Sequence, residues 1–231
     1  MTDRADVLGA LGTVYDPELD EPITSLRFVT SCDVSAAGDV DVRLRLPTPQ
    51  CAPNFAYLMA ADARDAVLRL PEVGTVTVVL EDHYTGDEIN AAVGRGGTFA
   101  DAFPDETDGE LDALRELFRR KALVARQSRL CERLLAGGAT VGDVAARRVA
   151  DLPDDPDARR CIELRAHLGI RSDEDAPAFV LPGGEPIAAS DLRQWLRTAS
   201  LVRTSLEANG GICRSLLRAR YGIPDPEEVA A

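Results

Sequence analysis

The chain has 231 residues, of which 45% are hydrophobic and 28% charged, and its formal net charge is -13. This length and composition are typical of a soluble protein with one large domain or two small ones. The acidic balance argues against nucleic acid and membrane surfaces as partners, because both are bound chiefly through Lys and Arg. The sequence has no apolar run near the roughly 20 residues needed to cross a bilayer and does not begin like a signal peptide, so we expect a cytoplasmic protein.

The first elements predict a short helix followed by a hairpin. Residues 3–14 carry apolar side chains at helical spacing, and Pro17 ends this helix. Residues 23–34 are rich in β-branched and aromatic side chains, whereas residues 39–46 alternate apolar with charged ones. Together these two segments predict a β-hairpin with one buried face.

A second helix, a third strand and a third helix are predicted next. Residues 55–70 follow a 3.6-residue apolar period, and residues 75–82 alternate again. The sequence TGDE favours a capping box between Thr85 and Glu88 at the start of the third helix. The order α-β-β-α-β-α predicts a small two-layer α+β domain over residues 1–103.

The remainder, residues 104–231, is predicted to be a mostly α-helical domain. The segment 94–110 (GRGGTFADAFPDETDGE) has the composition of a linker. The helices we expect beyond it cover 108–135, a short stretch from Thr140, a stretch from Pro156 behind the cap Asp155, 190–206, and a last one after Gly210 and Gly211. AFVLPGGEPI predicts a short β-hairpin near 178–187.

Five cysteines are spread along the chain without a CxxC pair, which argues against disulfides, a zinc ribbon or a thioredoxin-like motif. Cys32 lies in the first strand and is interpreted as a core residue. In the second domain, cysteines and a histidine could converge only through tertiary folding, and we interpret them as packing residues: Cys131, Cys161, His167 and Cys213. Trp195 is interpreted as a core or interface anchor.

Cys51 is the candidate of greatest chemical interest. It lies in PTPQCAPN, residues 47–54, between a predicted strand and a predicted helix. The unpaired N–H groups and the dipole of a helix N-terminus favour an anion, and a thiolate is both the nucleophilic and the metal-binding form of cysteine. The alternative is that Cys51 packs as a small apolar residue against the start of the helix.

An ordered set of short motifs resembles one family. These motifs are DPE at 16–18, the hairpin, TPxC at 48–51 and LPEVGTVTVVL at 70–80. Together they make the chain, over about residues 3–95, similar to the metal-sulfur (iron-sulfur) cluster assembly domain of the SufT and PaaD type. By this resemblance, Cys51 matches the family's cysteine at the helix start, and residues 16–18 match its acidic turn. The family motif runs TPxCP, whereas here Ala52 separates Cys51 from Pro53.

The resemblance implies an accessory factor, not an enzyme. Such factors mature iron-sulfur proteins, and PaaD-type members accompany multicomponent oxygenases. We therefore expect Cys51 to hold or transfer iron or an iron-sulfur cluster transiently, with Asp16, Glu18 and His83 as further candidate metal ligands. The helical domain would dock a client metalloprotein or oxygenase component. One thiol cannot complete the usual four-ligand set of a cluster, so a homodimer, a client cysteine or another thiol must contribute.

Other interpretations remain open from the sequence. Asp16 and Glu18 can simply cap and reverse the chain, and His83 can be an exposed residue at a strand end. One alternative function is an interaction subunit of an oxygenase complex without metal chemistry. A less favoured one is a thiol enzyme in which His83 activates Cys51, which requires the two side chains within about 3 Å of each other.

Overall fold

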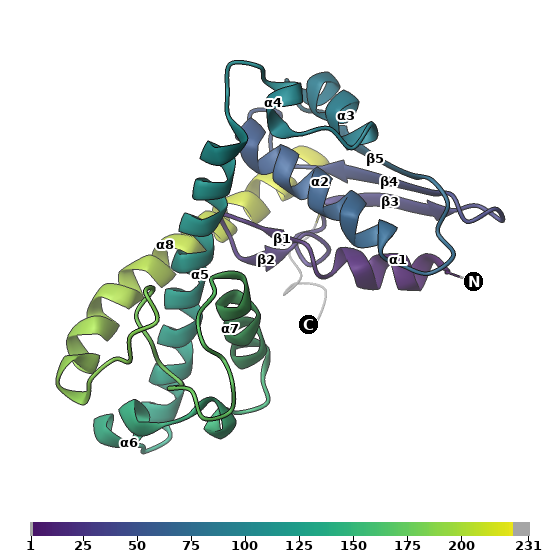
Figure 1. Cartoon of the computed structure of the whole chain (residues 1–231). Coiled ribbons are helices and arrows are strands. Elements are labelled where there is room, and N and C mark those ends of the chain that lie inside the picture. The colour runs from purple at the N-terminus through teal and green to yellow at the C-terminus, as the bar shows by residue number, and fades with distance from the viewer. Residues whose placement is uncertain (1, 224–231) are drawn as a thin grey trace. The chain divides into compact units, whose positions relative to one another are not determined.

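The computed structural model describes residues 2–223 (Figure 1). The chain divides into two compact units, the first formed by the chain up to Ala113 together with the segment from Asn209, and the second by Leu114–Ala208. The fold is α+β as predicted, with the sheets in the first unit and helices throughout the second. Within residues 2–223, no helix is long and apolar enough to span a membrane.

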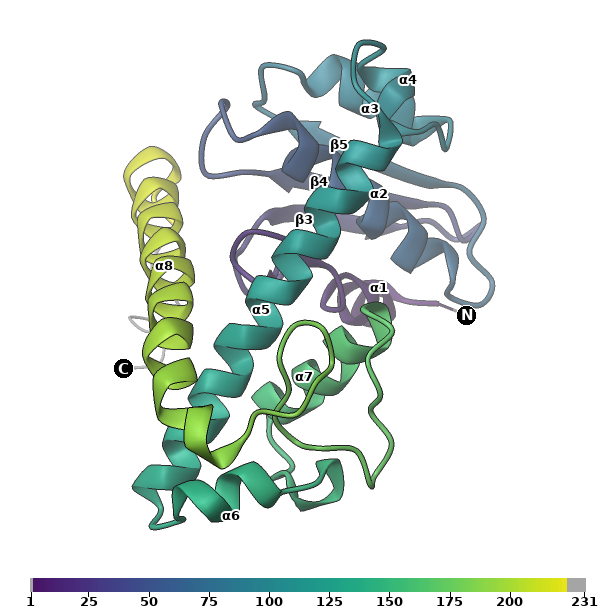
Figure 2. The same ribbon diagram turned by 60° about the vertical axis from the view of Figure 1, so that its left-hand side comes forward.

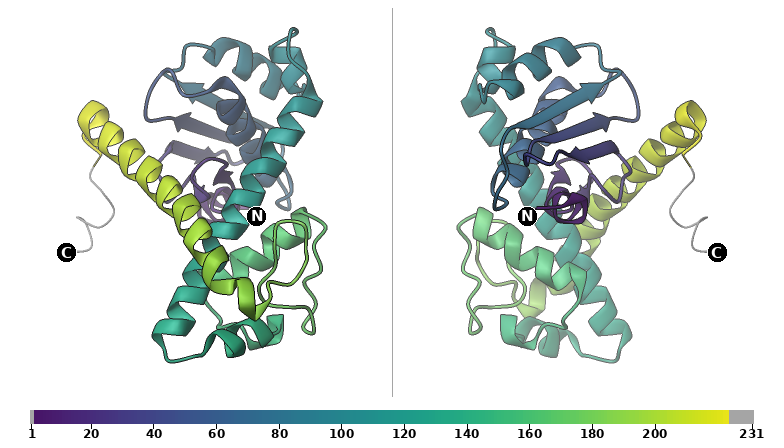
Figure 3. Two further views of the ribbon diagram at one scale, coloured as in Figure 1. Left: turned by 90° about the vertical axis from the view of Figure 1, so that its left-hand side faces the viewer. Right: turned by 90° about the vertical axis from the view of Figure 1, so that its right-hand side faces the viewer.

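The first unit contains a three-stranded sheet in the order β3-β4-β5 (Figure 3). β3 (Val29–Val34) and β4 (Val40–Arg45) form the predicted antiparallel hairpin, and β5 (Val76–Glu81) pairs with β4 in parallel. Alternate residues of β4 and β5 are buried, because successive side chains of a strand point to opposite faces. The alternation in the sequence therefore identified the buried face correctly.

Helices pack against this sheet and against each other. α1 (Arg4–Leu11) begins at Asp3, whose side chain forms a capping box with Asp6, and α1 contacts β3. α2 (Pro53–Leu68) connects β4 to β5 and buries the apolar face that its period predicts. α3 (Gly86–Gly94) contacts α2 and β5, so the predicted helix-strand order is confirmed.

Two predictions for the first unit are wrong. Thr85 precedes α3 but does not cap it through its side chain; its hydroxyl lies 3.1 Å from Nδ1 of His83 instead. The predicted linker contains α4 (Phe99–Ala102), which Thr98 caps. Phe99 is buried and meets the Tyr57 ring edge-to-face, with the ring centroids 5.4 Å apart. The segment was predicted to be a linker because it is rich in glycine. It forms an ordered helix instead, because burial of the Phe99 ring stabilises it.

The second unit is built from helices around its own core. It contains most of α5 (Asp108–Ala136), then α6 (Val141–Ala146), the 3-10 helix η1 (Val149–Asp151) and α7 (Pro156–His167). Asp155 caps α7, as the sequence predicted, and Thr140, where a helix was expected to start, is the N-cap of α6. Between α7 and α8 (Ala189–Tyr221), Val180 and Pro186 form an isolated antiparallel bridge within the segment predicted as a hairpin.

α8 is one continuous helix, and the predicted interruption at Gly210 and Gly211 is wrong (Figure 2). Glycine in a helix costs about 1 kcal/mol relative to alanine, which long helices tolerate. A Cβ at Gly210 would lie 3.1 Å from Oε1 of Glu21, so the missing side chain allows α8 to approach the first unit's acidic turn closely.

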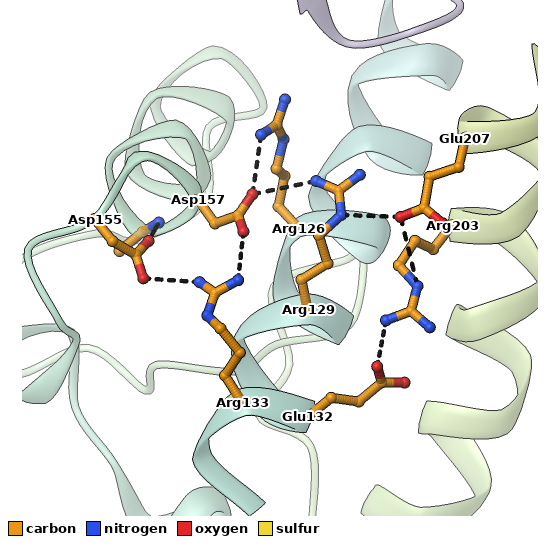
Figure 4. Close-up of polar contacts among 9 residues, drawn as sticks. Arg126, Arg129, Glu132, Arg133, Asp155, Asp157, Arg203 and Glu207 are labelled. Atoms are coloured by element: carbon orange, nitrogen blue, oxygen red, sulfur yellow. Dashed lines mark hydrogen bonds and ion pairs between the residues drawn. The ribbon is translucent and has the colours of Figure 1, made fainter. Parts of the chain in front are cut away.

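A charged network joins α5 to the start of α7 inside the second unit (Figure 4). Arg126 and Arg129 contact one oxygen of Asp157 at 2.9 and 3.2 Å. Arg133 contacts the other oxygen at 2.7 Å and also reaches Asp155 at 2.7 Å. Burial would raise the pKa of Asp157, but hydrogen bonds from Arg133 and Arg126 and the surrounding positive charges lower it below its usual value.

We expect Asp157→Asn to lower the stability of the second unit by about 1–3 kcal/mol near neutral pH, because three arginines would lose their shared carboxylate. The effect should shrink as the pH falls through the lowered pKa of Asp157, where the wild-type carboxylate itself becomes protonated. Trp195 is the single tryptophan and lies in the second unit, so its fluorescence in a denaturant titration measures this. Asp154→Asn, at an exposed ion pair with Arg159, is the control and should change stability by less than about 0.5 kcal/mol. Equal effects of the two changes would contradict the role of the network.

Candidate functional site

Cys51 lies in the connection between β4 and α2. Its backbone N–H donates to the carbonyl of Thr48 over 3.4 Å, and its sulfur lies 3.5 Å from Oγ1 of Thr48. Ala52 is the N-cap of α2 and Pro53 its first residue, so the thiol stands one residue before the cap. Cys51 is partly exposed while packing against the first core, and an incoming ion or partner can therefore reach it.

His83 fixes the backbone of this connection. Its Nε2 lies 2.8 Å from the carbonyl oxygen of Cys51, and the N–H of Thr85 donates to Nδ1 over 3.3 Å. These partners assign the proton to Nε2, which donates to the carbonyl. The N–H of Tyr84 also donates to the carbonyl of Pro49 over 3.1 Å. The segment after β5 thus holds the Cys51 loop in place, and the imidazole is bonded to the backbone of Cys51 rather than to its sulfur.

The acidic turn joins two very short strands, β1 (Tyr15–Asp16) and β2 (Glu21–Pro22). One carboxylate oxygen of Asp16 accepts hydrogen bonds from the backbone N–H groups of Glu18 at 2.8 Å and Leu19 at 3.0 Å. This geometry bears out the interpretation of the turn as a chain reversal.

Asp16 is nevertheless an unusual turn residue, because it is 8% exposed. Burial raises its pKa to about 7; the two backbone hydrogen bonds oppose this rise, and the charges of Glu18 and Glu21 add to it. The carboxyl group can therefore gain or lose a proton near neutral pH, which an ordinary aspartate cannot do.

The C-terminal half of α8 packs on the first unit through a stripe of residues spaced four apart: Asn209, Cys213, Leu217 and Tyr221. Asn209 Nδ2 donates to Oε1 of Glu18 over 3.2 Å. Leu217 is 2% exposed and belongs to the first core, against which Cys213 also packs. The Tyr221 hydroxyl donates to a carboxylate oxygen of Asp82 over 2.5 Å. The stripe therefore faces the acidic turn and the sheet, as residues at i, i+4 and i+8 share one helix face.

Cys213 lies within electrostatic range of the other candidate residues. Burial raises the pKa of Cys213 to about 12, and electrostatic interactions with Asp16, Cys51 and Glu18 add to the rise, whereas Arg214 opposes it. The interpretation of Cys213 as a packing residue of a separate helical domain missed this neighbourhood. The four-residue spacing of Asn209, Cys213, Leu217 and Tyr221 was visible in the sequence, but the two glycines concealed that one helix carries all four.

Cys51, Cys213, Asp16 and Glu18 thus all belong to the first unit, where both thiols pack against the same hydrophobic core. Cys131 and Cys161 are buried in the second unit, where they neighbour each other instead. Among residues 2–223, no three or more His, Cys, Asp or Glu side chains are placed to hold a metal ion by themselves. A cysteine sulfur suits iron and its clusters in kind, but the further ligands must come from elsewhere.

Comparison with known proteins gives a matching family model and a related protein. A family model described as "Iron-sulfur cluster assembly protein" matches residues 4–78, a range that includes Asp16, Glu18 and Cys51 but neither His83 nor Cys213. An uncharacterized protein of Methanocaldococcus jannaschii is 34% identical over 90 residues, which are 39% of this chain and 93% of that protein. No solved structure gives a significant match.

Proposed function

Since the chain belongs to the iron-sulfur cluster assembly protein family, we propose that it is an accessory maturation factor in which Cys51 holds iron or a cluster and passes it to a client. The observation that carries this proposal is the partly exposed thiol just before α2, in a loop held by His83. The proposed role is transfer between proteins, without enzymatic turnover. The cargo is iron or a cluster, bound transiently.

The residues around Cys51 support such a role by their positions. Cys51 directly precedes the N-cap of α2, and its thiolate is the form that would bind metal. Thr48 places a hydroxyl beside the sulfur and can donate a hydrogen bond to it. His83 keeps the loop backbone in one conformation, so less conformational entropy is lost when the sulfur binds its cargo.

The described residues of the first unit supply too few ligands to complete a cluster, so transfer of iron or a cluster to a client fits this site better than stable storage does. A cluster usually takes four protein ligands, and the first unit has no such set among its described residues. Client cysteines, or a second copy of this chain, would complete the coordination and could then replace the thiol. In this proposal the second unit docks the client, a metalloprotein or an oxygenase component, and the chain works in the cytoplasm.

We expect Cys51→Ser to reduce iron and sulfide bound after anaerobic reconstitution by about tenfold or more, because a hydroxyl is a poor ligand for iron-sulfur clusters. Transfer to an apo-ferredoxin, used as a generic acceptor, should fall in parallel. Cys131→Ala removes a thiol from the second unit and is the matched control, expected to behave as the wild type. If Cys51→Ser binds and transfers as well as the wild type does, the thiol role is refuted and the interaction-subunit alternative gains support.

A further inference from the structure

We propose that the ring of Tyr84 and the carboxylates of Asp87 and Glu88 receive the client segment that carries the accepting cysteine, and that this segment is basic. We call these three residues the Tyr84 surface. The inference rests on the proposed function and names the chemistry of the partner at that site. The second unit would dock the rest of the client, whereas the Tyr84 surface would hold the accepting sulfur near Cys51.

Transfer of the cargo requires that the client cover the exposed residues next to Cys51. The accepting cysteine must bind the cargo while Cys51 still holds it. A metal–thiolate bond is about 2.3 Å long, so two sulfurs that share one tetrahedral ion lie about 4 Å apart. Gln50 and Ala52, on either side of Cys51, are exposed. A partner that covers them typically buries about 800 Å² of surface, which extends well beyond the loop itself.

Tyr84 lies beside the Cys51 loop through contacts of both its backbone and its ring. Its N–H donates to the carbonyl of Pro49 over 3.1 Å. Its ring is tilted by 32° to the His83 ring, and the two centroids are 5.1 Å apart. Nε2 of His83 lies 2.8 Å from the carbonyl oxygen of Cys51. The His83 imidazole therefore neighbours both the Tyr84 ring and the backbone of Cys51, so a single partner covers both.

The exposure of Tyr84 suits a binding role better than a role in the fold. Tyr84 is 59% exposed, whereas every other aromatic side chain of residues 2–223 is buried or half-buried. Its backbone is bonded to the Cys51 loop and its ring rests beside His83, so little conformational entropy is lost when a partner covers it. Tyrosines in such settings are among the residues that carry the most binding energy in protein interfaces.

The charges around Tyr84 favour a basic partner. Asp87 and Glu88 follow it in the first turn of α3, and both are exposed. The first unit contains 25 Asp and Glu residues against 10 Lys and Arg, whereas the second contains 14 against 16. A lysine or arginine of the client is attracted to this charge and can also lie over the Tyr84 ring. An acidic segment would be repelled.

The Tyr84 surface would act before the ligands are exchanged. Opposite charges at the edge of an interface mainly raise the rate of association, so the basic segment arrives with its cysteine beside the cargo. The client thiol then releases its proton and binds the metal, and the Cys51 thiolate leaves the metal and takes up a proton. The oxidation states of the metal and of both sulfurs do not change.

Thiol–disulfide exchange with two charged peptides tests the Tyr84 surface without any metal. Each peptide has one cysteine joined to 2-nitro-5-thiobenzoate, flanked by two lysines in one peptide and by two glutamates in the other. The Cys51 thiolate attacks the peptide sulfur, a mixed disulfide forms, and the coloured thiobenzoate leaves, so its absorbance gives the rate. The full chain carries Cys213→Ala in every sample, because the three remaining cysteines besides Cys51 are buried.

The lysine peptide should react about tenfold faster than the glutamate peptide at low ionic strength, and this ratio should fall as salt is added. Asp87→Asn combined with Glu88→Gln should lower the ratio to about twofold. Tyr84→Ala should slow the reaction of the lysine peptide by about fivefold. Iodoacetamide is small and uncharged, so it should alkylate Cys51 in Tyr84→Ala at the wild-type rate.

Matched variants control for charge and for folding. Glu110→Gln combined with Asp112→Asn removes two carboxylates from other exposed positions of the first unit, and it should keep the tenfold ratio expected above. Tyr84→Phe keeps the ring and should react as the wild type does. Thermal unfolding of each variant shows whether it is folded, because carboxylates at the start of α3 also interact favourably with its helix dipole.

The outcomes separate the Tyr84 surface from the proposed function. Equal rates for the two peptides, or a ratio unchanged by Asp87→Asn with Glu88→Gln, would overturn this inference whatever Cys51→Ser does in reconstitution. Slower alkylation by iodoacetamide in Tyr84→Ala would show that Tyr84 acts on the thiol, and would overturn its role in docking. A ratio that falls only in variants of the Tyr84 surface supports the inference. If Cys51→Ser reconstitutes as the wild type does, the proposed function falls, and the peptide ratio still decides whether a basic segment docks here.

Discussion

Arg165→Ala should lower the free energy of unfolding of the second unit by about 3–5 kcal/mol. Arg165 is 1% exposed, and its guanidinium donates to the carbonyl of Pro177 over 2.9 Å, to the carbonyl of Ala178 and to Oε1 of Gln127 over 3.3 Å. Removing it would leave a cavity and buried acceptors without their donor. These losses add to the missing packing, since an unsatisfied buried polar group costs about 1–3 kcal/mol.

The fluorescence of Trp195 during denaturation measures this effect, because the only tryptophan lies in the second unit. Arg159→Ala changes an exposed arginine of the same helix and is the control, expected to shift stability by less than about 0.5 kcal/mol. A shift for Arg165→Ala no larger than that of the control would show that the buried guanidinium does not hold the 177–180 segment.

The stability of the first unit should fall as the pH rises from about 4 to about 7, owing to Asp16. Its pKa is about 7 in the folded chain but near the usual 3.8 when unfolded, so over this range only the unfolded state releases the proton. Below both values the contribution is fully present, and it is lost as the pH rises through the folded pKa. The total effect is on the order of 4 kcal/mol.

Asp16→Asn should remove this part of the pH dependence and leave the first unit more stable than the wild type at pH values near 8. The charged groups that act on Asp16 remain in place, namely Glu18 and Glu21. All four tyrosines lie in the first unit, so tyrosine fluorescence monitors its unfolding.

Asp65→Asn, at an exposed position of α2, is the control for Asp16→Asn. It should keep the wild-type pH dependence. Parallel pH profiles of Asp16→Asn and the wild type would show that Asp16 is not the group responsible.

Local patterns in the sequence were sufficient to predict the three-stranded sheet and the position of Cys51 between a strand and a helix. The strands were identified because one face is buried, which gives a strict alternation, and α2 because its apolar face follows a helical period. The helix start at Pro53 followed from the tolerance of proline in the first helical turn. Each of these features depends on residues close together in the chain.

The features that the sequence did not predict depend on distant contacts. Phe99 lies in a Gly-rich stretch and is buried beside the rings of Tyr57 and Phe103. His83 was expected as a candidate metal ligand or an exposed residue; the sequence did not predict its bond to the Cys51 carbonyl, which joins loops 32 residues apart. The approach of Cys213 to the acidic turn depends on α8 continuing through two glycines, which helix propensity alone disfavours.

The first unit is assembled from two segments of the chain that the whole second unit separates, and this has a consequence for biogenesis. The bond from Asn209 to Glu18 spans 191 residues, so it cannot form until the ribosome has synthesised the second unit. Proteins fold from the N-terminus during synthesis. A nascent chain can therefore form the sheet and display Cys51 alone, whereas Cys213 arrives only after translation has passed α8. The first unit is therefore completed only after the whole second unit has been synthesised.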